Sequence, residues 1–287
     1  MSFQPSVVSK QDSADAYKSS DGTWVADRNG VTLRSAFQPI FCVRNERFVP
    51  VAAEGLLRVF HGSERVATGS FFKGLANHKR DEIESLTRTM HIRNAQFLAP
   101  SMRRLFVNFD PSVLGSPSRF ESTLANIGRE LLRTEIAPGN VVCEITEQKA
   151  FDTVALKEFV YMLRARGYLV AVDDFGAQSS NLERVAALTP DIVKLDGRMV
   201  QQKMADPQGF FELKRMIEQF KHERIQVVLE GIQKSWQLIL ATKTKADFYQ
   251  GFALAVPRIA PAKFPEWEKI SSRDAVTGAH QAVFATK

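Results

Sequence analysis

Cysteine and long hydrophobic runs are scarce in this sequence. The 287 residues include two cysteines, Cys42 and Cys143, and these match no CxxC pattern. Two cysteines cannot form a disulfide framework, which excludes a disulfide-rich scaffold and a zinc ribbon. No apolar run approaches the length that spans a bilayer, and residues 1–20 lack the apolar core of a secretory signal. We therefore expect a cytoplasmic protein with no membrane span.

Phosphate-binding glycine loops and basic–aromatic runs are also missing. Without a Walker-type or dinucleotide-type loop, a kinase or a dehydrogenase is disfavoured. Without a recognisable nucleic-acid module, we expect no binding to duplex nucleic acid. The chain has 38 Lys and Arg residues against 32 acidic residues, a net charge of +6. This mild excess suits an anionic small molecule as well as it suits nucleic acid.

The apolar pattern predicts buried strands that mostly alternate with amphipathic helices. Helical spacing is clear in Leu156, Phe159, Val160 and Leu163. The predicted strands are short runs rich in Val, Ile, Leu and Phe, at 36–43, 48–57, 104–109, 140–145, 168–173, 191–195, 225–229 and 246–252. This alternation favours an α/β fold, a (β/α)8 barrel of the TIM type.

The first two predicted strands break the barrel pattern. The link between them, residues 44–47, is too short for the helical crossover that parallel strands need. We therefore expect an irregular barrel whose first strand is antiparallel. Residues 1–33 are polar and predict a flexible N-terminal arm, residues 34–270 the barrel domain, and residues 271–287 a C-terminal tail.

Nearly every predicted strand ends in an acid or an amide. Barrel enzymes carry their sites at these ends. The residues concerned are Glu54, Asn108, Glu144, Asp173 with Asp174, Lys194 with Asp196, Glu230 and Gln250. Each alone is better explained as a helix cap or a solvated loop residue. Several carboxylates at one end of a closed barrel would repel one another and require cations.

The ligand chemistry of these strand ends favours hard divalent ions. Oxygen ligands without histidine are typical of Mg²⁺ or Mn²⁺ sites. The adjacent carboxylates Asp173 and Asp174 could serve two ions, as in phosphodiester hydrolysis, although Asp174 could equally cap the next helix. Lys194 and Asp196, two residues apart, would share one face of a strand. Lys194 could stabilise charge on a phosphate or form a structural ion pair.

Taken together, these segments resemble the EAL-domain phosphodiesterases that hydrolyse cyclic di-GMP, over residues 34–258. The segments that carry the resemblance are FQPIF (37–41), EGLLR (54–58), VNFDP (107–111), EITE (144–147), DDFG (173–176), KLD (194–196), EG (230–231) and QG (250–251). The resemblance implies opening of cyclic di-GMP to linear pGpG with two Mg²⁺ or Mn²⁺ ions.

The resemblance also implies roles for individual residues. One metal ion would be held by Glu54, Asn108, Glu144 and Asp173, and a second by Asp173 and Asp174. Lys194 and Glu230 would hold and activate the attacking water. Gln38 and Arg58 would contact the substrate, Gln250 would lie beside the metal–water cluster, and Glu147 would steady the loop after DDFG, through which homodimerisation is expected.

The sequence departs from the family pattern at a few positions. The signature alanine is Gly55, for which we expect a small structural effect, and the serine of VNxSP is Asp110. The loop at 177–182 reads AQSSNL instead of TGYSSL, and Gln233 replaces a second glutamate after EG. Besides the active enzyme, the last two changes leave open a catalytically silent receptor of cyclic di-GMP. A protein-interaction module without ligand binding is the third alternative, and the retained Gln38 and Arg58 oppose it.

Overall fold

The protein folds around a closed barrel of mixed parallel and antiparallel strands. This computed structural model describes residues 15–99, 101–102, 104–110, 117–145, 153–177, 182–261, 267 and 270–271. The barrel order is β3 (Val31–Arg44), β11 (Phe248–Tyr249), β10 (Gln226–Leu229), β9 (Ile192–Leu195), β8 (Leu169–Phe175), β7 (Val141–Ile145), β6 (Arg104–Phe109) and β4 (Arg47–His61). A pairing of β4 with β3 closes the ring. The eight strands predicted from the sequence are confirmed.

Strand β3 makes the barrel irregular, as predicted. It pairs antiparallel with β4 on one side and with β11 on the other, whereas the remaining barrel pairs are parallel. The β3–β4 turn consists of Asn45 and Glu46, with φ of 48° and 57°. Positive φ at both turn residues matches the twist of a tight hairpin, so the chain reverses here without a crossover helix.

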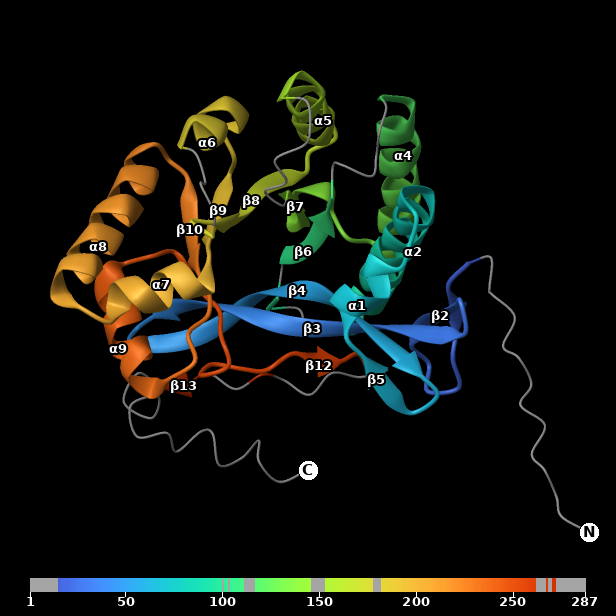
Figure 1. Ribbon diagram of the computed structural model, residues 1–287, viewed down its shortest axis with the longest axis horizontal. Coiled ribbons are helices and arrows are strands. Elements are labelled where there is room, and N and C mark those ends of the chain that lie inside the picture. Colours follow the sequence, from blue (N-terminus) through green and yellow to red (C-terminus); the bar gives the residue numbers. More distant parts are fainter. Residues whose placement is uncertain are drawn as a thin grey trace, which may run out of the picture.

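Helices cover the outside of the barrel. Figure 1 shows α4, α5, α6 and α8 on the outer side of the strands. The helices are α1 (Thr68–Lys73), α2 (Asn77–Ala95), α4 (Pro117–Thr134), α5 (Thr153–Ala165), α6 (Leu182–Leu188), α7 (Gly197–Met204), α8 (Pro207–His222) and α9 (Ser235–Thr244), with a 3-10 turn at Pro138–Asn140. The apolar face predicted for α5 is buried through Phe159 and Leu163, and α8 buries Leu213 and Ile217. None of the helices in the described ranges is long and apolar enough to cross a membrane.

Residues 15–33 correct the prediction of a flexible arm. They form β1 (Tyr17–Lys18), β2 (Trp24–Arg28) and the start of β3, all antiparallel neighbours. The signal that was overlooked is Asn29-Gly30, with φ of 49° and 74°, which is the preferred pair for a tight hairpin turn. Residues 1–14 and 272–287 lie outside the described residues.

The β3–β4 hairpin is longer than the barrel needs, and Figure 1 shows it extending towards β2 and β5 (Glu64–Val66). This extension has its own hydrophobic cluster, in which Leu33 and Val59 pack with Ile83 and Met90 of α2. Short strands β12 (Arg258–Ile259) and β13 (Ile270–Ser271) add to β3 and β4. The extension therefore holds α2 beside β4 and β6.

Candidate active site

Two adjacent layers of side chains lie inside the barrel near its open end. The lower one, here called the apolar layer, consists of Ile40, Ala52, Phe106, Val142, Ala171, Ile192 and Val228, with Phe248 packed against it. Side chains on a strand return to the same face every second residue. Two residues further towards the open end stand Gln38, Glu54, Asn108, Glu144, Asp173, Lys194, Glu230 and Gln250. We call this set the polar layer, and it contains most of the site residues that the sequence predicts.

Lys194 lies at the centre of the polar layer. Its Nζ is 2.5 Å from Glu144 Oε1, 2.7 Å from Glu230 Oε1, 3.1 Å from Asp173 Oδ1 and 3.6 Å from Glu54 Oε2. The side chain is 1% exposed. Four strand ends thus direct their carboxylates at one buried ammonium group. A simple ion pair would give Lys194 one carboxylate partner, whereas here it has four.

Asp196 does not share that environment. Its carboxylate accepts hydrogen bonds from the backbone N–H groups of Arg198 and Met199, and it is the N-cap of α7. The strand ends at Leu195, so the period-2 argument that placed Asp196 beside Lys194 no longer applies there. For Asp196 the bland alternative, a helix cap, is correct.

Burial of the carboxylates has strong electrostatic consequences. Burial, assisted by Glu54 and Asp173, raises the pKa of Glu144 well above its ordinary value despite the nearby Lys194. Burial also raises the pKa of Glu230 to about 8. Burial lowers the pKa of Lys194, but the charges of Asp173, Glu144 and Glu230 outweigh it and hold that pKa well above the usual value. The layer is therefore short of positive charge.

A β-bulge brings the two adjacent aspartates together. Neighbouring residues in a regular strand point to opposite faces, but the β8–β9 register shifts between Val172 and Phe175, and Asp174 has a φ of 55°. As a result, Asp173, Asp174 and Glu230 each offer an oxygen, and these oxygens lie within 4.8 Å of one another. Burial, with the charge of Asp173, raises the pKa of Asp174 to about 6.

Two amide side chains complete the layer. Gln250 Nε2 donates to Glu54 Oε2 at 2.7 Å, and Gln38 Nε2 donates to the carbonyl of Ala255 at 3.2 Å. Gln38, Glu54 and Gln250 line one cavity at the barrel mouth together with Lys194 and Glu230. We call it the mouth cavity. The glycine after Glu230 is also explained, because a Cβ on Gly231, where φ is 65°, would lie 2.5 Å from Gly197 Cα.

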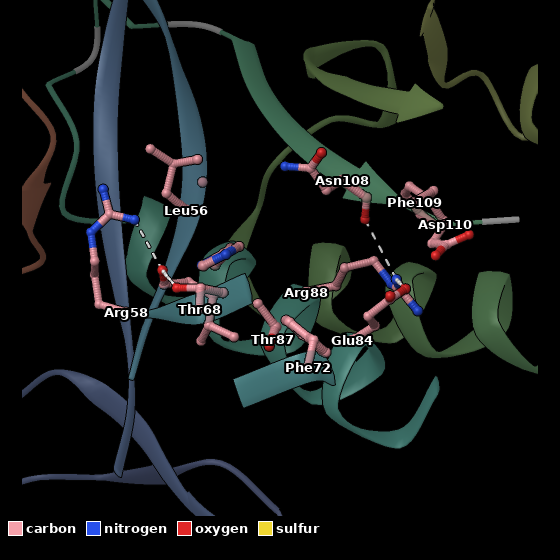
Figure 2. A pocket seen from close by; sticks show the side chains of 13 residues that line it. Leu56, Arg58, Thr68, Phe72, Glu84, Thr87, Arg88, Asn108, Phe109 and Asp110 are labelled. Carbon is pink, nitrogen blue, oxygen red and sulfur yellow. Dashed lines mark hydrogen bonds and ion pairs between the residues drawn. The ribbon is translucent and has the colours of Figure 1, made fainter. Parts of the chain in front are cut away.

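Arg58 lies in a second cavity, next to the first. This cavity, between α2, β4 and the end of β6, is here called the α2 cavity (Figure 2). Asn108 lines it too, and Leu56 lines both cavities. The sequence analysis did not single out its α2 residues, among them Arg88 and His91. Their stretch, DEIESLTRTMHIRN, is rich in charged residues and is typical of a solvated helix.

Some predicted features lie beyond the described residues. Glu147 is one of them, and so are residues 178–181 of the altered loop. Gln233 is described: it is exposed, lines the mouth cavity and donates its backbone N–H to Gln237 Oε1 at 2.8 Å. Asp110 is buried, but Pro111, the expected first residue of a helix, is outside the described ranges.

The polar layer has the properties of a divalent-cation site. Its donors are carboxylate and amide oxygens, the preferred ligands of hard ions. Glu144 Oε2 and Gln250 Oε1 are buried without a hydrogen-bond partner among the described residues. Buried acceptors without donors are costly, and a cation would satisfy them. The residues present therefore fit the metal ions that the resemblance implies.

Comparison with known proteins agrees with this geometry. The family model of the EAL domain matches residues 26–257, and the chain belongs to this family. RocR of Pseudomonas aeruginosa, a cyclic di-GMP phosphodiesterase, is 30% identical over 154 residues, 53% of this chain and 38% of RocR. The EAL-domain protein YkuI of Bacillus subtilis is 29% identical over 227 residues, 77% of this chain and 54% of YkuI. The chain thus spans about half the length of these relatives or less.

Solved structures confirm the barrel. YkuI in complex with cyclic di-GMP and calcium superposes with a TM-score of 0.71 at 23% identity, covering 88% of this chain and 62% of YkuI. BlrP1 of Klebsiella pneumoniae, solved with manganese and the same dinucleotide, gives 0.69 at 22% identity, covering 83% and 57%. At these identities the likeness establishes the fold, and the chemistry must be argued from the residues of this chain.

Proposed function

We propose that this protein is a metal-dependent phosphodiesterase that hydrolyses cyclic di-GMP to linear pGpG. The observation that carries the proposal is the polar layer, in which four carboxylates converge on the buried Lys194. RocR, a relative, is a cyclic di-GMP phosphodiesterase, and YkuI and BlrP1 bind cyclic di-GMP in the solved structures. A chain kept only as an interaction module has no need of this costly cluster.

The residues divide into ligands and acid–base groups. Glu54, Asn108, Glu144 and Asp173 would hold one divalent ion, and Asp173 with Asp174 a second. When bound, Mg²⁺ or Mn²⁺ supplies Lewis-acid stabilisation of phosphate charge. The calcium and manganese in the YkuI and BlrP1 structures support divalent ions in this fold.

The chemical step adds water to phosphorus and breaks the P–O3′ bond. Glu230, whose Oε1 lies 2.7 Å from Lys194 Nζ at the barrel mouth, would accept a proton from that water. Lys194 offsets charge that develops on the phosphate. The proton ends on the departing 3′ oxygen, which leaves pGpG with a 5′ phosphate. Gln38 and Arg58 bind the substrate, with Gln250 beside the reacting groups, and Glu147 steadies the loop after Gly176.

The test is product analysis with a matched variant. Purified protein is incubated with cyclic di-GMP and Mn²⁺, alongside Glu54→Ala, and the products are separated by chromatography. We expect pGpG from the wild type alone. Tight binding of cyclic di-GMP without pGpG would instead establish a silent receptor, the alternative favoured by Gln233 and the altered 177–182 loop.

Assembly and location complete the proposal. We place the protein in the cytoplasm, where a soluble dinucleotide is available, and as a homodimer joined through the loop after Gly176. Residues 34–270 remain the proposed barrel domain, extended on its N-terminal side by β1 and β2. Light scattering at micromolar concentration tests the dimer, and a monomer mass there would refute it.

A further inference from the structure

The turn after β10, residues 230–232, carries the proposed proton acceptor Glu230, and the sheet holds it loosely. Strand β10 ends one residue earlier, at Leu229. The backbone N–H of Glu230 donates to the carbonyl oxygen of Leu195 at 3.4 Å. A second backbone bond, from the N–H of Ile232 to the carbonyl oxygen of Gln250, is 3.2 Å long. Both exceed the usual length of about 2.9–3.0 Å, so the turn needs support from outside the sheet.

Gln201 of α7 supplies such support. Its Nε2 donates to the carbonyl oxygen of Gly231 at 2.7 Å, in a partly buried position. This bond is shorter than both backbone bonds, and its acceptor belongs to the residue directly after Glu230. Gln201 does not line the mouth cavity, so its effect on the site must pass through the turn.

The backbones of α7 and of the turn touch, which keeps this bond short. A Cβ on Gly197, the first residue of α7, would lie 2.8 Å from Gly231 Cα, and a Cβ on Gly231 would lie 3.1 Å from Gln201 Nε2. Glycine at both positions permits the close approach. The two segments thus fit together only in this arrangement, in which Gln201 faces the turn.

Helix α7 is a rigid support for the turn. Asp196 caps its N-terminus, and Val200 and Met204 are buried. The helix follows directly on β9, the strand that carries Lys194. It therefore connects the strand of Lys194 to the turn of Glu230, whose Oε1 lies 2.7 Å from Lys194 Nζ. Side chains that are held by such packed elements keep a precise geometry.

We propose that Gln201 is a positioning residue: by holding the carbonyl of Gly231, it fixes the carboxylate of Glu230 beside Lys194. A general base acts only within hydrogen-bond reach of the proton that it accepts. A displacement of about 1 Å can cost about a hundredfold in rate. Loss of the bond to Gly231 would therefore slow hydrolysis without changing a substrate contact. This inference deepens the proposed function, and its catalytic consequence rests on it.

The test compares Gln201→Met with the wild type on cyclic di-GMP and Mn²⁺, with pGpG measured by chromatography. Methionine keeps the length of the side chain and lacks the donor. We expect kcat to fall roughly ten- to a hundredfold and KM to change less than about twofold, because the bond affects the reacting geometry and not substrate binding. Amide hydrogen exchange, followed by mass spectrometry, should become faster in a peptide that covers residues 230–234.

Two further variants separate this bond from a general weakening of α7. Gln202→Met makes the same change at the next residue, which is exposed, and should leave kcat and exchange unchanged. Gln201→Arg restores a donor, because arginine Nε is as many bonds from the backbone as glutamine Nε2. Its kcat should return to within about threefold of the wild-type value. Thermal melting checks the fold of each variant.

The outcomes distinguish this inference from the proposed function. An active wild type with unchanged kcat in Gln201→Met, or with a change in KM alone, would overturn the inference and leave the proposed function intact. Equal losses in Gln201→Met and Gln202→Met, or in Gln201→Met and Gln201→Arg, would also overturn it. If the wild type forms no pGpG, the proposed function fails and hydrogen exchange decides. Faster exchange of 230–234 in Gln201→Met alone would support the hold on the turn, and equal exchange would refute it.

Discussion

The two layers inside the barrel lie two residues apart on the same strands, and the centre of the polar layer is as deeply buried as the apolar layer. Phe106 and Val228 of the apolar layer are at most 1% exposed, and Glu144 and Lys194 of the polar layer are equally buried. The apolar layer gains free energy from burial, roughly 1.5–3 kcal/mol for a large side chain. The polar layer is buried at a cost, because its carboxylates outnumber its lysine. The difference indicates that one layer holds the fold together and that the other is kept for its chemistry.

The largest expected effect is on the apolar layer. Phe106→Ala should lower the free energy of unfolding by about 3–5 kcal/mol, because it removes a fully buried ring and leaves a cavity between the strands. Urea unfolding measures this loss. Ile192→Val, the milder control in the same layer, should cost about 0.5–1.5 kcal/mol. Activity per folded molecule should persist in both, and loss of activity in the folded fraction would show that the layers are not independent.

In the polar layer we expect the opposite result, a loss of activity without a loss of stability. Glu144→Gln should reduce hydrolysis of cyclic di-GMP about a hundred- to a thousandfold, since it removes a charge from the reacting centre. Its stability in urea should equal or exceed that of the wild type, because burial already disfavours the ionised carboxyl. Lys194 retains Glu230 and Asp173 as partners.

Glu130→Gln is the matched control for that pair of results. Burial raises the pKa of Glu130, but hydrogen bonds from Arg93 and the charges of Arg93 and Arg133 hold it below the ordinary value. The charge of Glu130 therefore stabilises the fold, and its removal should lower stability and leave activity intact. A stability loss in Glu144→Gln as large as that in Glu130→Gln would contradict the contrast between functional and structural carboxylates.

Glu84 of α2 tests whether a carboxylate outside the barrel is also buried at a cost in stability. Burial raises its pKa from 4.5 to about 7. Between these values the folded protein binds a proton that the unfolded chain has released, so stability falls as pH rises, by up to about 3 kcal/mol. Urea unfolding at pH 5 and pH 7 should show a larger decline for the wild type than for Glu84→Gln. Equal declines would show that Glu84 ionises normally in the folded protein.

Most of the fold and the polar layer could be predicted because both depend on short-range patterns. Apolar runs mark the strands, and the period of two fixes which residue stands above each core residue. Asp173, Lys194 and Glu230 were therefore placed correctly at the strand ends. The same period gave the wrong partner for Lys194, because Asp196 lies past the end of its strand, where a helix begins.

Features that depend on packing between distant segments could not be predicted. In the sequence, Arg88 is one of many charged residues in the α2 segment. It is buried only because β4 and β6 pack against that helix in the folded protein. The side chains of Asp173 and Asp174 lie close together because of a β-bulge, and no residue type in this segment predicts that bulge. The β1–β2 segment was different, because Asn29-Gly30 is a local signal and was available in the sequence.

Gly55 shows that packing against α2 governs the outer face of β4 beside Glu54. Gly55 follows Glu54, and the sequence predicted that glycine in place of the family's alanine would matter little. In the structure a Cβ at this position would lie 2.8 Å from Cγ and Cδ2 of His91. Burial, with the charges of Arg58 and Arg88, lowers the pKa of His91 to about 3, so the ring is neutral, and its Nδ1 lies 2.8 Å from Ser35 Oγ.

Glycine at 55 and histidine at 91 should therefore behave as an interlocked pair. Gly55→Ala alone should cost about 1–3 kcal/mol, because His91 is held by Ser35 and has little room to retreat. His91→Ala alone should also destabilise, since it leaves a cavity beside β4. In the double variant the new methyl group enters the vacated space, so urea unfolding should show a smaller loss than the sum of the single losses. Strictly additive losses would mean that Gly55 and His91 do not compete for the same volume, and the stability of β4 beside Glu54 would need another explanation.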